Sequence, residues 1–444
     1  MVSSIVSNAG GSYNKRGNGT GLITGKAGLQ MVIRGGTILT PFEILRGKEL
    51  LINGEWITGI EKEQGASSGG DVLDAAGCLI CPGFIDLHTH GGGGGDFMDD
   101  SDEAFETALQ FHAQNGTTSV LPTSVTAPPA DILRMFSRAR RFRDRKETGC
   151  RVLGVHVEGP FLSQKNKGAQ KEQDLLEPDR DGYGFLLDNA DIAVRVTLSP
   201  ELPGAEQMTR ELTRRGVLVS GGHDNGRSEE ILPVVAAGMR HLTHHFCAMS
   251  QASIVNGVRS VGLTELGLVD ERLTLELIAD GRHLPPEMVR LAYRCKGAEK
   301  ICLVSDSLRA GGMPEGDALY ILGPKGQESP QLFLVEDGVA KLPDRSRFAG
   351  SVQPLSRMVR NLVEDCGIPL IDAVRMASET PARILGVSGE MGSLLPGMRA
   401  DICILGPDLS PVGVLIGGRL LNGARPGRER HAPGSSRRLR SPVE

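Results

Sequence analysis

The sequence lacks an apolar run approaching the roughly 18 residues of a membrane-spanning helix, so we expect no membrane segment. It also lacks an excess of basic residues. Against 49 Lys and Arg stand 54 Asp and Glu, so the net charge is −5, which gives no electrostatic basis for binding nucleic acid. The first 30 residues contain neither the apolar core nor the cleavage pattern of a signal peptide. An alternative for them is organelle targeting, since they contain Lys15, Arg16 and Lys26 and no acidic residue.

Clustered cysteines are missing as well. The eight cysteines are scattered, and the single CxxC pair, Cys78 and Cys81, has no second pair to complete a zinc knuckle. Most of them lie in apolar runs, where a free cysteine behaves as a small core residue. We therefore expect a reducing compartment and a cytoplasmic protein.

What the chain does contain is a long middle section in which apolar strand-like runs alternate with helix-like segments. Its 444 residues, 39% hydrophobic and 23% charged, describe an ordinary globular protein of the α/β class. Helices are predicted at 102–115, 129–145, 204–215, 227–237, 286–297, 354–366 and 369–377. Strands are predicted at 83–90, 117–122, 151–158, 192–198, 217–223, 239–245, 273–279 and 300–306. Eight strands is the number that a closed parallel barrel requires.

Short strands separated by turns occupy both ends of this section. Residues 31–82 and 395–424 are rich in them, so we predict one small sheet domain built from both termini beside a barrel of residues 83–394. Asn53-Gly54 between apolar flanks predicts a tight hairpin. A further inserted hairpin is predicted from about 319 to 342. Residues 1–30 and the basic segment 425–444 are predicted to be disordered.

Histidines and carboxylates stand at the ends of several predicted strands. His88 and His90 are two residues apart on one strand, so their imidazoles share a face and could bind a metal ion. Asp86 lies deeper and could orient a ligand histidine. The alternative is that these histidines are structural.

A second set consists of Glu158, His223 and His244, each at a different strand end. Two histidines and one carboxylate, with a position left open for water, are typical of a hydrolytic metal site. Asp306 ends the last strand, where an aspartate could take a proton from water and deliver it to a leaving group. A helix-capping role is the alternative for Asp306.

Two residues near other strand ends suit an anion. His283 follows Ile278-Ala279-Asp280-Gly281, and Arg259 lies in the preceding loop. An imidazole and a guanidinium there could clamp a phosphate group, although a loop arginine is often only solvated. His112, His241 and His245 are expected to be structural.

Most of the candidate site residues lie in or near six short motifs. The motifs are Pro82-Gly83-Phe84-Ile85-Asp86-Leu87-His88, His156-Val157-Glu158-Gly159-Pro160-Phe161, Gly222-His223, Thr243-His244 with Ala248-Met249, Ile278-Ala279-Asp280-Gly281 and Leu303-Val304-Ser305-Asp306. In order and spacing the chain resembles, from about residue 31 to 424, the N-acetylglucosamine-6-phosphate deacetylases of the amidohydrolase superfamily. The resemblance implies a distorted (β/α)₈ TIM barrel with a small β-sandwich made by both terminal segments, and a homodimer.

The resemblance also implies roles for single residues. Glu158, His223 and His244 match the main metal ligands, and Asp306 matches the general base and acid. His88 and His90 match members that hold a second ion. His283 and Arg259 match residues that contact the sugar phosphate, the arginine often reaching across the dimer.

The chain departs from the family pattern around the substrate. Gly168-Ala169-Gln170 stands where the family has histidine as the third residue, near the scissile carbonyl, so Gln170 is expected to donate a neutral hydrogen bond to the developing oxyanion. Cys247-Ala248-Met249 replaces Asn-Ala-Met, and we expect Cys247 and Ala248 to contact substrate. Arg259 and Gly262 are what remains of the family's His-Arg-Glu-Pro-Gly loop.

The expected activity is therefore metal-dependent hydrolysis of an N-acetyl group on an amino sugar phosphate. The expected reaction converts N-acetylglucosamine 6-phosphate to glucosamine 6-phosphate and acetate, using one or two divalent ions per subunit (zinc, iron, cobalt or manganese). Alternatives are N-acetylgalactosamine 6-phosphate or an N-acyl amino acid as substrate, or a non-catalytic descendant that binds sugar phosphate. The hydantoinase branch is disfavoured because Ser199-Pro200-Glu201 stands where that branch has a modified lysine.

Overall fold

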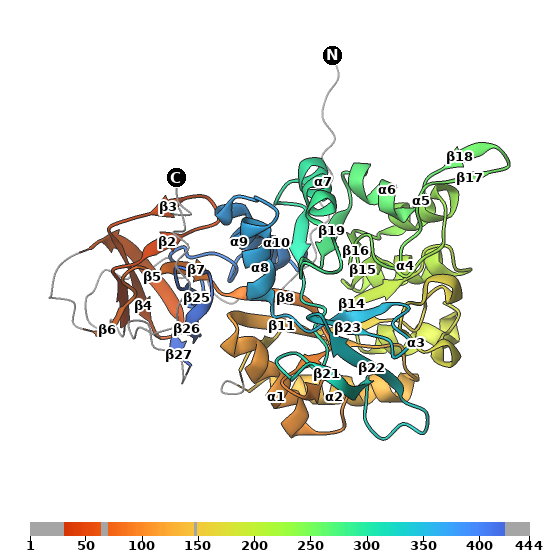
Figure 1. The fold of residues 1–444 in the computed structure, drawn as a ribbon, viewed down its shortest axis with the longest axis horizontal. Coiled ribbons are helices and arrows are strands. Elements are labelled where there is room, and N and C mark those ends of the chain that lie inside the picture. Colours follow the sequence, from red (N-terminus) through yellow and green to blue (C-terminus); the bar gives the residue numbers. More distant parts are fainter. Residues whose placement is uncertain (1–30, 64–69, 146–148, 422–444) are drawn as a thin grey trace, which may run out of the picture.

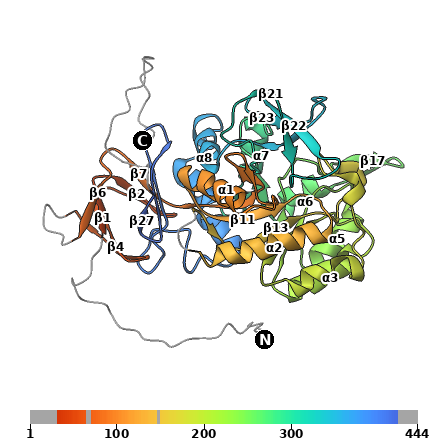
Figure 2. The ribbon, with the colours of Figure 1, turned by 90° about the horizontal axis from the view of Figure 1, so that it is seen from below.

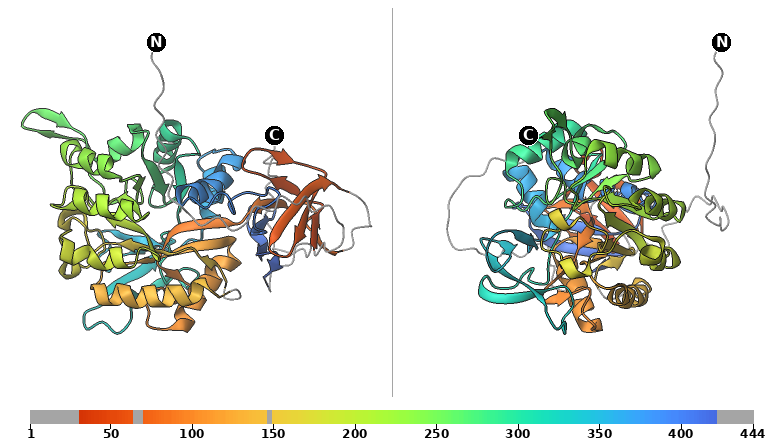
Figure 3. Two further views of the ribbon diagram at one scale, coloured as in Figure 1. Left: turned by 180° about the vertical axis from the view of Figure 1, so that it is seen from behind. Right: turned by 90° about the vertical axis from the view of Figure 1, so that its right-hand side faces the viewer.

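The computed structural model describes residues 31–63, 70–145 and 149–421. The segments predicted to be disordered, 1–30 and 425–444, lie outside the described residues. The core of the protein is a ring of parallel strands with helices around it (Figures 1 and 3).

Eight parallel strands follow one another around this ring. They are β8 (Phe84–Thr89), β11 (Thr117–Ser124), β13 (Val155–Glu158), β14 (Ala193–Leu198), β15 (Leu218–Gly221), β16 (His241–Leu242), β19 (Thr274–Leu277) and β20 (Ile301–Leu303). Each pairs in parallel with the next. Between β20 and β8, Asp306 N donates to His88 O (2.9 Å) and His90 N donates to Ser307 O (2.9 Å). The barrel is thus nearly closed, which confirms the predicted fold class.

One predicted strand, 151–158, is divided in the structure. Its first part, β12 (Arg151–Val152), pairs with β11, and its second part is β13. Gly154 lies between them at φ +152°, where a Cβ would come within 2.6 Å of both γ-carbons of Val194. The break therefore brings the chain close to the neighbouring strand before Glu158 is reached.

All seven predicted helices are present. They are α1 (Asp102–Gln114), α2 (Pro129–Arg143), α4 (Ala205–Arg214), α5 (Ser228–Ala237), α7 (Pro286–Lys296), α8 (Leu355–Glu364) and α9 (Leu370–Ala377). Three further helices were not predicted, namely α3 (Arg180–Asp188), α6 (Leu263–Val269) and α10 (Glu379–Ile384). Two of these contain glycine, which weakens the helical pattern in the sequence. None of the described helices combines the length and apolar character needed to span a membrane.

The beginning and end of the described chain meet in two further sheets beside the barrel (Figure 1). One has the order β5-β4-β1-β6, formed by β1 (Met31–Arg34), β4 (Lys48–Asn53), β5 (Trp56–Lys62) and β6 (Asp71–Asp74). The other has the order β27-β26-β25-β7-β2-β3, formed by β2 (Thr37–Leu39), β3 (Ile44–Leu45), β7 (Leu79–Pro82), β25 (Ile402–Leu405), β26 (Pro411–Ile416) and β27 (Arg419–Leu420).

These two sheets share a hydrophobic core separate from that of the barrel. Ile33 and Leu50 from the first sheet are buried in it with Ile80 and Ile404 from the second. Strand β7 pairs with β25, so that Cys81 lies opposite Cys403. The predicted sheet region built from both ends is present.

Besides a short antiparallel pair, β9 (Gly91–Gly92) with β10 (Gly95–Asp96), two larger antiparallel elements lie against the barrel. The predicted hairpin at 319–342 is part of a larger four-stranded sheet, formed by β21 (Gly316–Leu322), β22 (Gln331–Glu336), β23 (Val339–Lys341) and β24 (Phe348–Ser351). Strand β24 returns to the barrel, where Ser351 N donates to Asp306 O (2.9 Å). A second hairpin, β17 (Ser253–Val255) with β18 (Val258–Ser260), projects from the body (Figures 1 and 2).

Candidate metal centre

The carboxyl ends of five barrel strands bring six predicted residues into one cluster. Each of the six is at most 7% exposed. They are His88 and His90 on or after β8, Glu158 at the end of β13, His223 after β15, His244 after β16 and Asp306 after β20. Because parallel strands end at the same rim of a barrel, residues far apart in the sequence converge there.

Glu158 stands at the centre of this cluster. Its Oε1 lies 3.2 Å from His223 Nε2 and 3.1 Å from His244 Nε2. The two Nε2 atoms lie 3.0 Å from each other. Glu158, His223 and His244 thus offer three ligand atoms around one point, as the sequence predicted.

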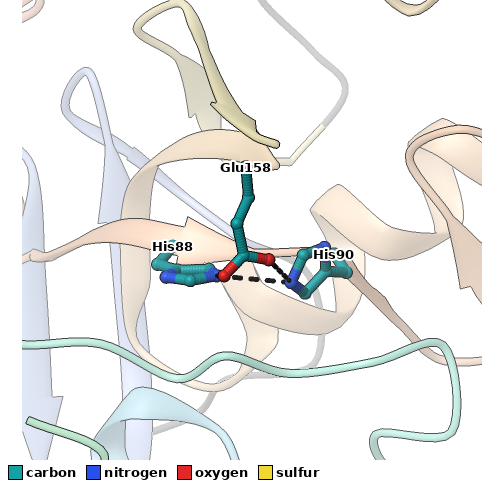
Figure 4. Close-up of side chains that lie close together, drawn as sticks. All are labelled: His88, His90 and Glu158. Carbon is teal, nitrogen blue, oxygen red and sulfur yellow. Dashed lines mark hydrogen bonds and ion pairs between the residues drawn. The ribbon is translucent and has the colours of Figure 1, made fainter. Parts of the chain in front are cut away.

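The other side of Glu158 faces the first strand (Figure 4). Its Oε2 lies 3.4 Å from His90 Nε2, and its Oε1 lies 3.5 Å from His88 Nε2. Asp306 Oδ1 lies 3.1 Å from His90 Nε2 and 3.4 Å from His88 Nε2. Glu158 therefore belongs to two overlapping groups of possible ligands.

The chemistry of these donors fits a divalent cation. Two neutral imidazole nitrogens that face each other can form at most one hydrogen bond, yet His223 and His244 turn Nε2 atoms toward each other and toward the same carboxylate oxygen. Lone pairs converging from imidazole and carboxylate are the ligand set of zinc and of similar metals.

Hydrogen bonds on the far side of two rings set their orientation. His223 Nδ1 donates to Asn166 O (2.9 Å), and His88 Nδ1 donates to Glu276 Oε2 (3.2 Å). Both bonds leave Nε2 free to act as a ligand. The prediction that Asp86 would orient a ligand imidazole is wrong, because its Oδ1 accepts from the backbone N of His88 (3.2 Å) instead.

Opposite charges at the centre stabilise the ionised carboxylates. Burial acts to raise the pKa of Glu158, but the surrounding imidazoles outweigh it and hold the pKa well below its usual range. Burial likewise acts to raise the pKa of Asp306, and His88 and His90 outweigh it, so this pKa lies below its usual value. Both groups are therefore present as carboxylates at neutral pH.

Three site residues have left-handed backbone conformations. His223, His244 and Asp306 have φ values of 51°, 29° and 46°. Such conformations cost a non-glycine residue about 1–3 kcal/mol, and they cluster at functional sites. Here each lies two or three residues beyond the end of a barrel strand, at the rim where the cluster forms.

Residues of this cluster line a cavity of about 250 Å³. Four predicted substrate-contacting residues line its walls, namely Gln170, Cys247, Ala248 and His283. Residues that the sequence did not single out also line it, among them Val125, Leu322, Arg347 and Phe348. Arg259 lies on β18, exposed on the projecting hairpin, and does not line this cavity.

Gln170 makes two hydrogen bonds in the cavity wall. Its Nε2 donates to Glu158 Oε2 (2.8 Å), and its Oε1 accepts from Thr126 N (2.7 Å). One amide N–H thus orients the central carboxylate, a contact that the sequence did not reveal. Donation to an oxyanion, for which the second N–H is available, stays a prediction.

Other residues of the cavity lining present basic and aromatic side chains. His283 Nδ1 lies 2.7 Å from Asp280 Oδ2, while the His283 ring packs against Phe348 with centroids 5.0 Å apart. The neighbouring Arg347 is exposed at the same cavity. Arg347 suits an anionic part of a ligand, whereas the cluster around Glu158 suits a carbonyl group and water.

The chain is similar to known proteins over most of its length. Residues 79–421 match the model of the amidohydrolase family. An N-acetylgalactosamine-6-phosphate deacetylase from Escherichia coli O157:H7 is 36% identical over 77% of this chain and 87% of the relative. An N-acetylglucosamine-6-phosphate deacetylase from Bacillus subtilis is 30% identical over 88% of this chain and 96% of the relative.

A solved structure agrees with these similarities. The N-acetyl-D-glucosamine-6-phosphate deacetylase of Mycobacterium smegmatis, solved as a mutant in complex with N-acetyl-D-glucosamine-6-phosphate, superposes with a TM-score of 0.79. The two chains are 32% identical, and the match covers 88% of this chain and 99% of the other.

Proposed function

The chain belongs to the amidohydrolase family, as its motifs predicted, and from this premise we propose that it removes the N-acetyl group from an amino sugar phosphate. The proposed substrate is N-acetylglucosamine 6-phosphate, and the products are glucosamine 6-phosphate and acetate. The observation that carries the proposal is the convergence of Glu158, His223 and His244 on one point with Asp306 beside them in the same cavity.

The residues at the centre form two groups, each of which could bind a metal ion. Glu158, His223 and His244 would hold one divalent ion, and His88, His90 and Glu158 could hold a second. Imidazole and carboxylate ligands suit zinc, iron, cobalt or manganese. A divalent ion bound there supplies Lewis acidity, which favours ionisation of water and polarises the amide carbonyl.

Asp306 carries the protons in this proposal. As a carboxylate at neutral pH it accepts the proton of the attacking water, and it then delivers that proton to the departing amine nitrogen. Gln170 keeps Glu158 in position and offers its second N–H to the carbonyl oxygen as negative charge develops. The reaction thus needs one acid–base group and a fixed central carboxylate.

The phosphate end is proposed to bind in the part of the cavity lined by His283 and Arg347. His283, which is oriented by Asp280, lies there with Arg347 at the edge of the same cavity. Charge-assisted hydrogen bonds from these groups would bind a phosphate group more tightly than a neutral hydroxyl.

We also propose a homodimer in which Arg259 of one subunit reaches the substrate of the other. The hairpin that carries it exposes Ile254 (66%) and Val258 (68%). Apolar side chains at the tip of a projecting element are typical of an interface. Mass measurement in solution tests the dimer, and a monomer at micromolar concentration contradicts it.

The test of the activity is acetate release by metal-analysed protein. The panel contains N-acetylglucosamine and N-acetylgalactosamine, each with and without a 6-phosphate, together with N-acetyl amino acids. We expect the highest kcat/KM for N-acetylglucosamine 6-phosphate. Higher kcat/KM for another compound contradicts this choice, and binding of sugar phosphate without acetate release favours a non-catalytic descendant.

One observation favours a second substrate. The relative from Escherichia coli, at 36% identity, is an N-acetylgalactosamine-6-phosphate deacetylase. The two sugars differ only in the orientation of the hydroxyl at carbon 4. The ratio of kcat/KM for the two 6-phosphates decides between them, because the phosphate and acetyl groups contribute equally to both.

A further inference from the structure

Glu276 is a buried carboxylate in the middle of strand β19, outside the set of metal-binding groups described above. We propose that Glu276, held in place by Arg195, is a positioning residue that fixes His88 and thereby sets the metal affinity of the His88–His90 half of the centre. The inference rests on the metal centre of the proposed function, but it concerns an earlier step, the binding of the ions.

The contact with His88 is made on the ring itself. Glu276 Oε2 accepts from His88 Nδ1 at 3.2 Å, and both side chains are fully buried. A carboxylate accepts only, so the proton of a neutral His88 must lie on Nδ1 and the lone pair on Nε2. That Nε2 faces Glu158 and Asp306, at 3.5 and 3.4 Å, where the second ion would lie.

The other ligand histidines are not held by Glu276 in this way. Its Oε2 also accepts from the backbone N of His244 at 3.0 Å, but this bond leaves the His244 ring unconstrained. Within the described residues, Nδ1 of His244 and Nδ1 of His90 have no hydrogen-bond partner. The His223 ring is oriented by Asn166 O. Glu276 therefore determines the proton position of one ligand ring, that of His88.

Arg195 holds the Glu276 carboxylate in one orientation. Its guanidinium is fully buried and contacts Glu276 Oε1 through Nη1. The same guanidinium donates to Leu87 O (3.0 Å), Ser220 Oγ (2.9 Å) and Thr243 Oγ1 (3.0 Å). These bonds tie it to segments on both sides of β19, so the carboxylate cannot turn away from His88 without breaking the network.

The expected effect is selective between the two ions. Loss of a hydrogen-bond partner on the far side of a metal-ligating histidine typically weakens metal binding about 10–100-fold. We expect this loss for the ion at His88 and His90. For the ion at Glu158, His223 and His244 we expect a change of less than about threefold, because Glu276 touches that half through a backbone N–H alone.

Two variants remove the contact in different ways. Glu276→Asp keeps the charge that Arg195 requires but withdraws the carboxylate by one methylene from His88. The double variant Arg195→Met/Glu276→Leu removes both charges and the acceptor of the His88 bond together, so that no buried charge is left without a partner. Ser220→Ala is the matched control, because it removes one bond of Arg195 and leaves the Glu276–His88 contact intact.

The measurement is zinc content and stepwise zinc affinity of each full-length variant, by elemental analysis and chelator competition, with circular dichroism to check the fold. We expect two zinc ions in the wild type and in Ser220→Ala. In both Glu276 variants one ion should dissociate about 10–100-fold more readily than in the wild type. If the double variant does not fold, the zinc affinities of Glu276→Asp alone test the inference.

Three results would overturn the inference: a single zinc ion in the wild type, unchanged affinities in Glu276→Asp, or equal weakening of both ions. None of these readouts involves acetate release. A protein that releases no acetate but loses one zinc ion selectively in Glu276→Asp refutes the proposed function and leaves the inference standing. An enzyme that releases acetate but has unchanged zinc affinities in Glu276→Asp refutes the inference and leaves the proposed function in place.

Discussion

His112 on α1 makes folding stability depend on pH in a direction that can be calculated. The ring is fully buried, and its Nε2 donates to Gly91 O (3.0 Å). Burial outweighs that hydrogen bond and lowers the pKa of His112 from 6.5 to about 4. Below pH 6.5 the imidazole of His112 therefore binds a proton in the unfolded chain, whereas in the folded protein it stays neutral until the pH approaches about 4. Stability falls as the pH drops through this range, and the loss levels off below about pH 4.

The size of the effect follows from the two pKa values, 6.5 in the unfolded chain and about 4 in the folded protein. The full difference corresponds to about 3 kcal/mol of unfolding free energy. Between pH 7.5 and pH 5.5 the part attributable to His112 is about 1.3 kcal/mol. That is a large fraction of the margin by which ordinary domains are stable.

The assay is urea unfolding at pH 7.5 and pH 5.5 with EDTA present, so that metal binding does not contribute. The comparison is between the wild type and His112→Gln, whose amide can donate to Gly91 O but does not titrate. We expect the variant to lose about 1.3 kcal/mol less than the wild type over this interval, whatever its absolute stability. An equal loss in both proteins would refute the reasoning, because the titrating group would then lie elsewhere.

The remaining predictions concern the cavity. Asp306→Asn should lower kcat by about 10²–10⁴-fold while elemental analysis still finds metal at Glu158, and retained turnover would exclude the proton-transfer role. Gln170→Leu removes the amide that donates to Glu158 Oε2, so chelator competition should show metal affinity about 10–100-fold lower; unchanged affinity would mean that the bond does not orient the carboxylate. Arg347→Ala should raise KM about tenfold for a sugar 6-phosphate and leave KM for the unphosphorylated sugar unchanged, and equal effects on both would place Arg347 away from the phosphate.

Local pattern was sufficient to predict the barrel and the centre of the site. Glu158 ends a barrel strand, His223, His244 and Asp306 follow within three residues of the ends of others, and strand ends in a parallel barrel share one rim. The positions of these side chains therefore follow from the sequence once the barrel is recognised. The left-handed backbone of His223, His244 and Asp306 gave no comparable signal in the sequence.

The rest of the site depends on contacts between distant segments. Glu276 sits inside an apolar strand, where the sequence offers a lone acidic residue and no indication that its partners are His88 and Arg195. Arg347 reaches the cavity because β24 pairs with β23 and returns to Asp306, and its neighbours in the sequence resemble an ordinary charged loop. Asp86 was assigned to the wrong partner because spacing along a strand fixes the face of a side chain and leaves its hydrogen bond open.

The pairing of β7 with β25 makes the order of synthesis matter. Strand β7 ends at Pro82 and β8 begins two residues later. The segment bearing His88 is therefore synthesised directly after β7, at a time when β25, the neighbour of β7 in the finished sheet, has not yet been made. Until residues 402–405 emerge, one edge of β7 has no partner and exposes its backbone groups to other nascent chains. A premature stop near residue 400 would therefore leave every residue of the candidate metal centre in the polypeptide, yet yield a chain prone to aggregate.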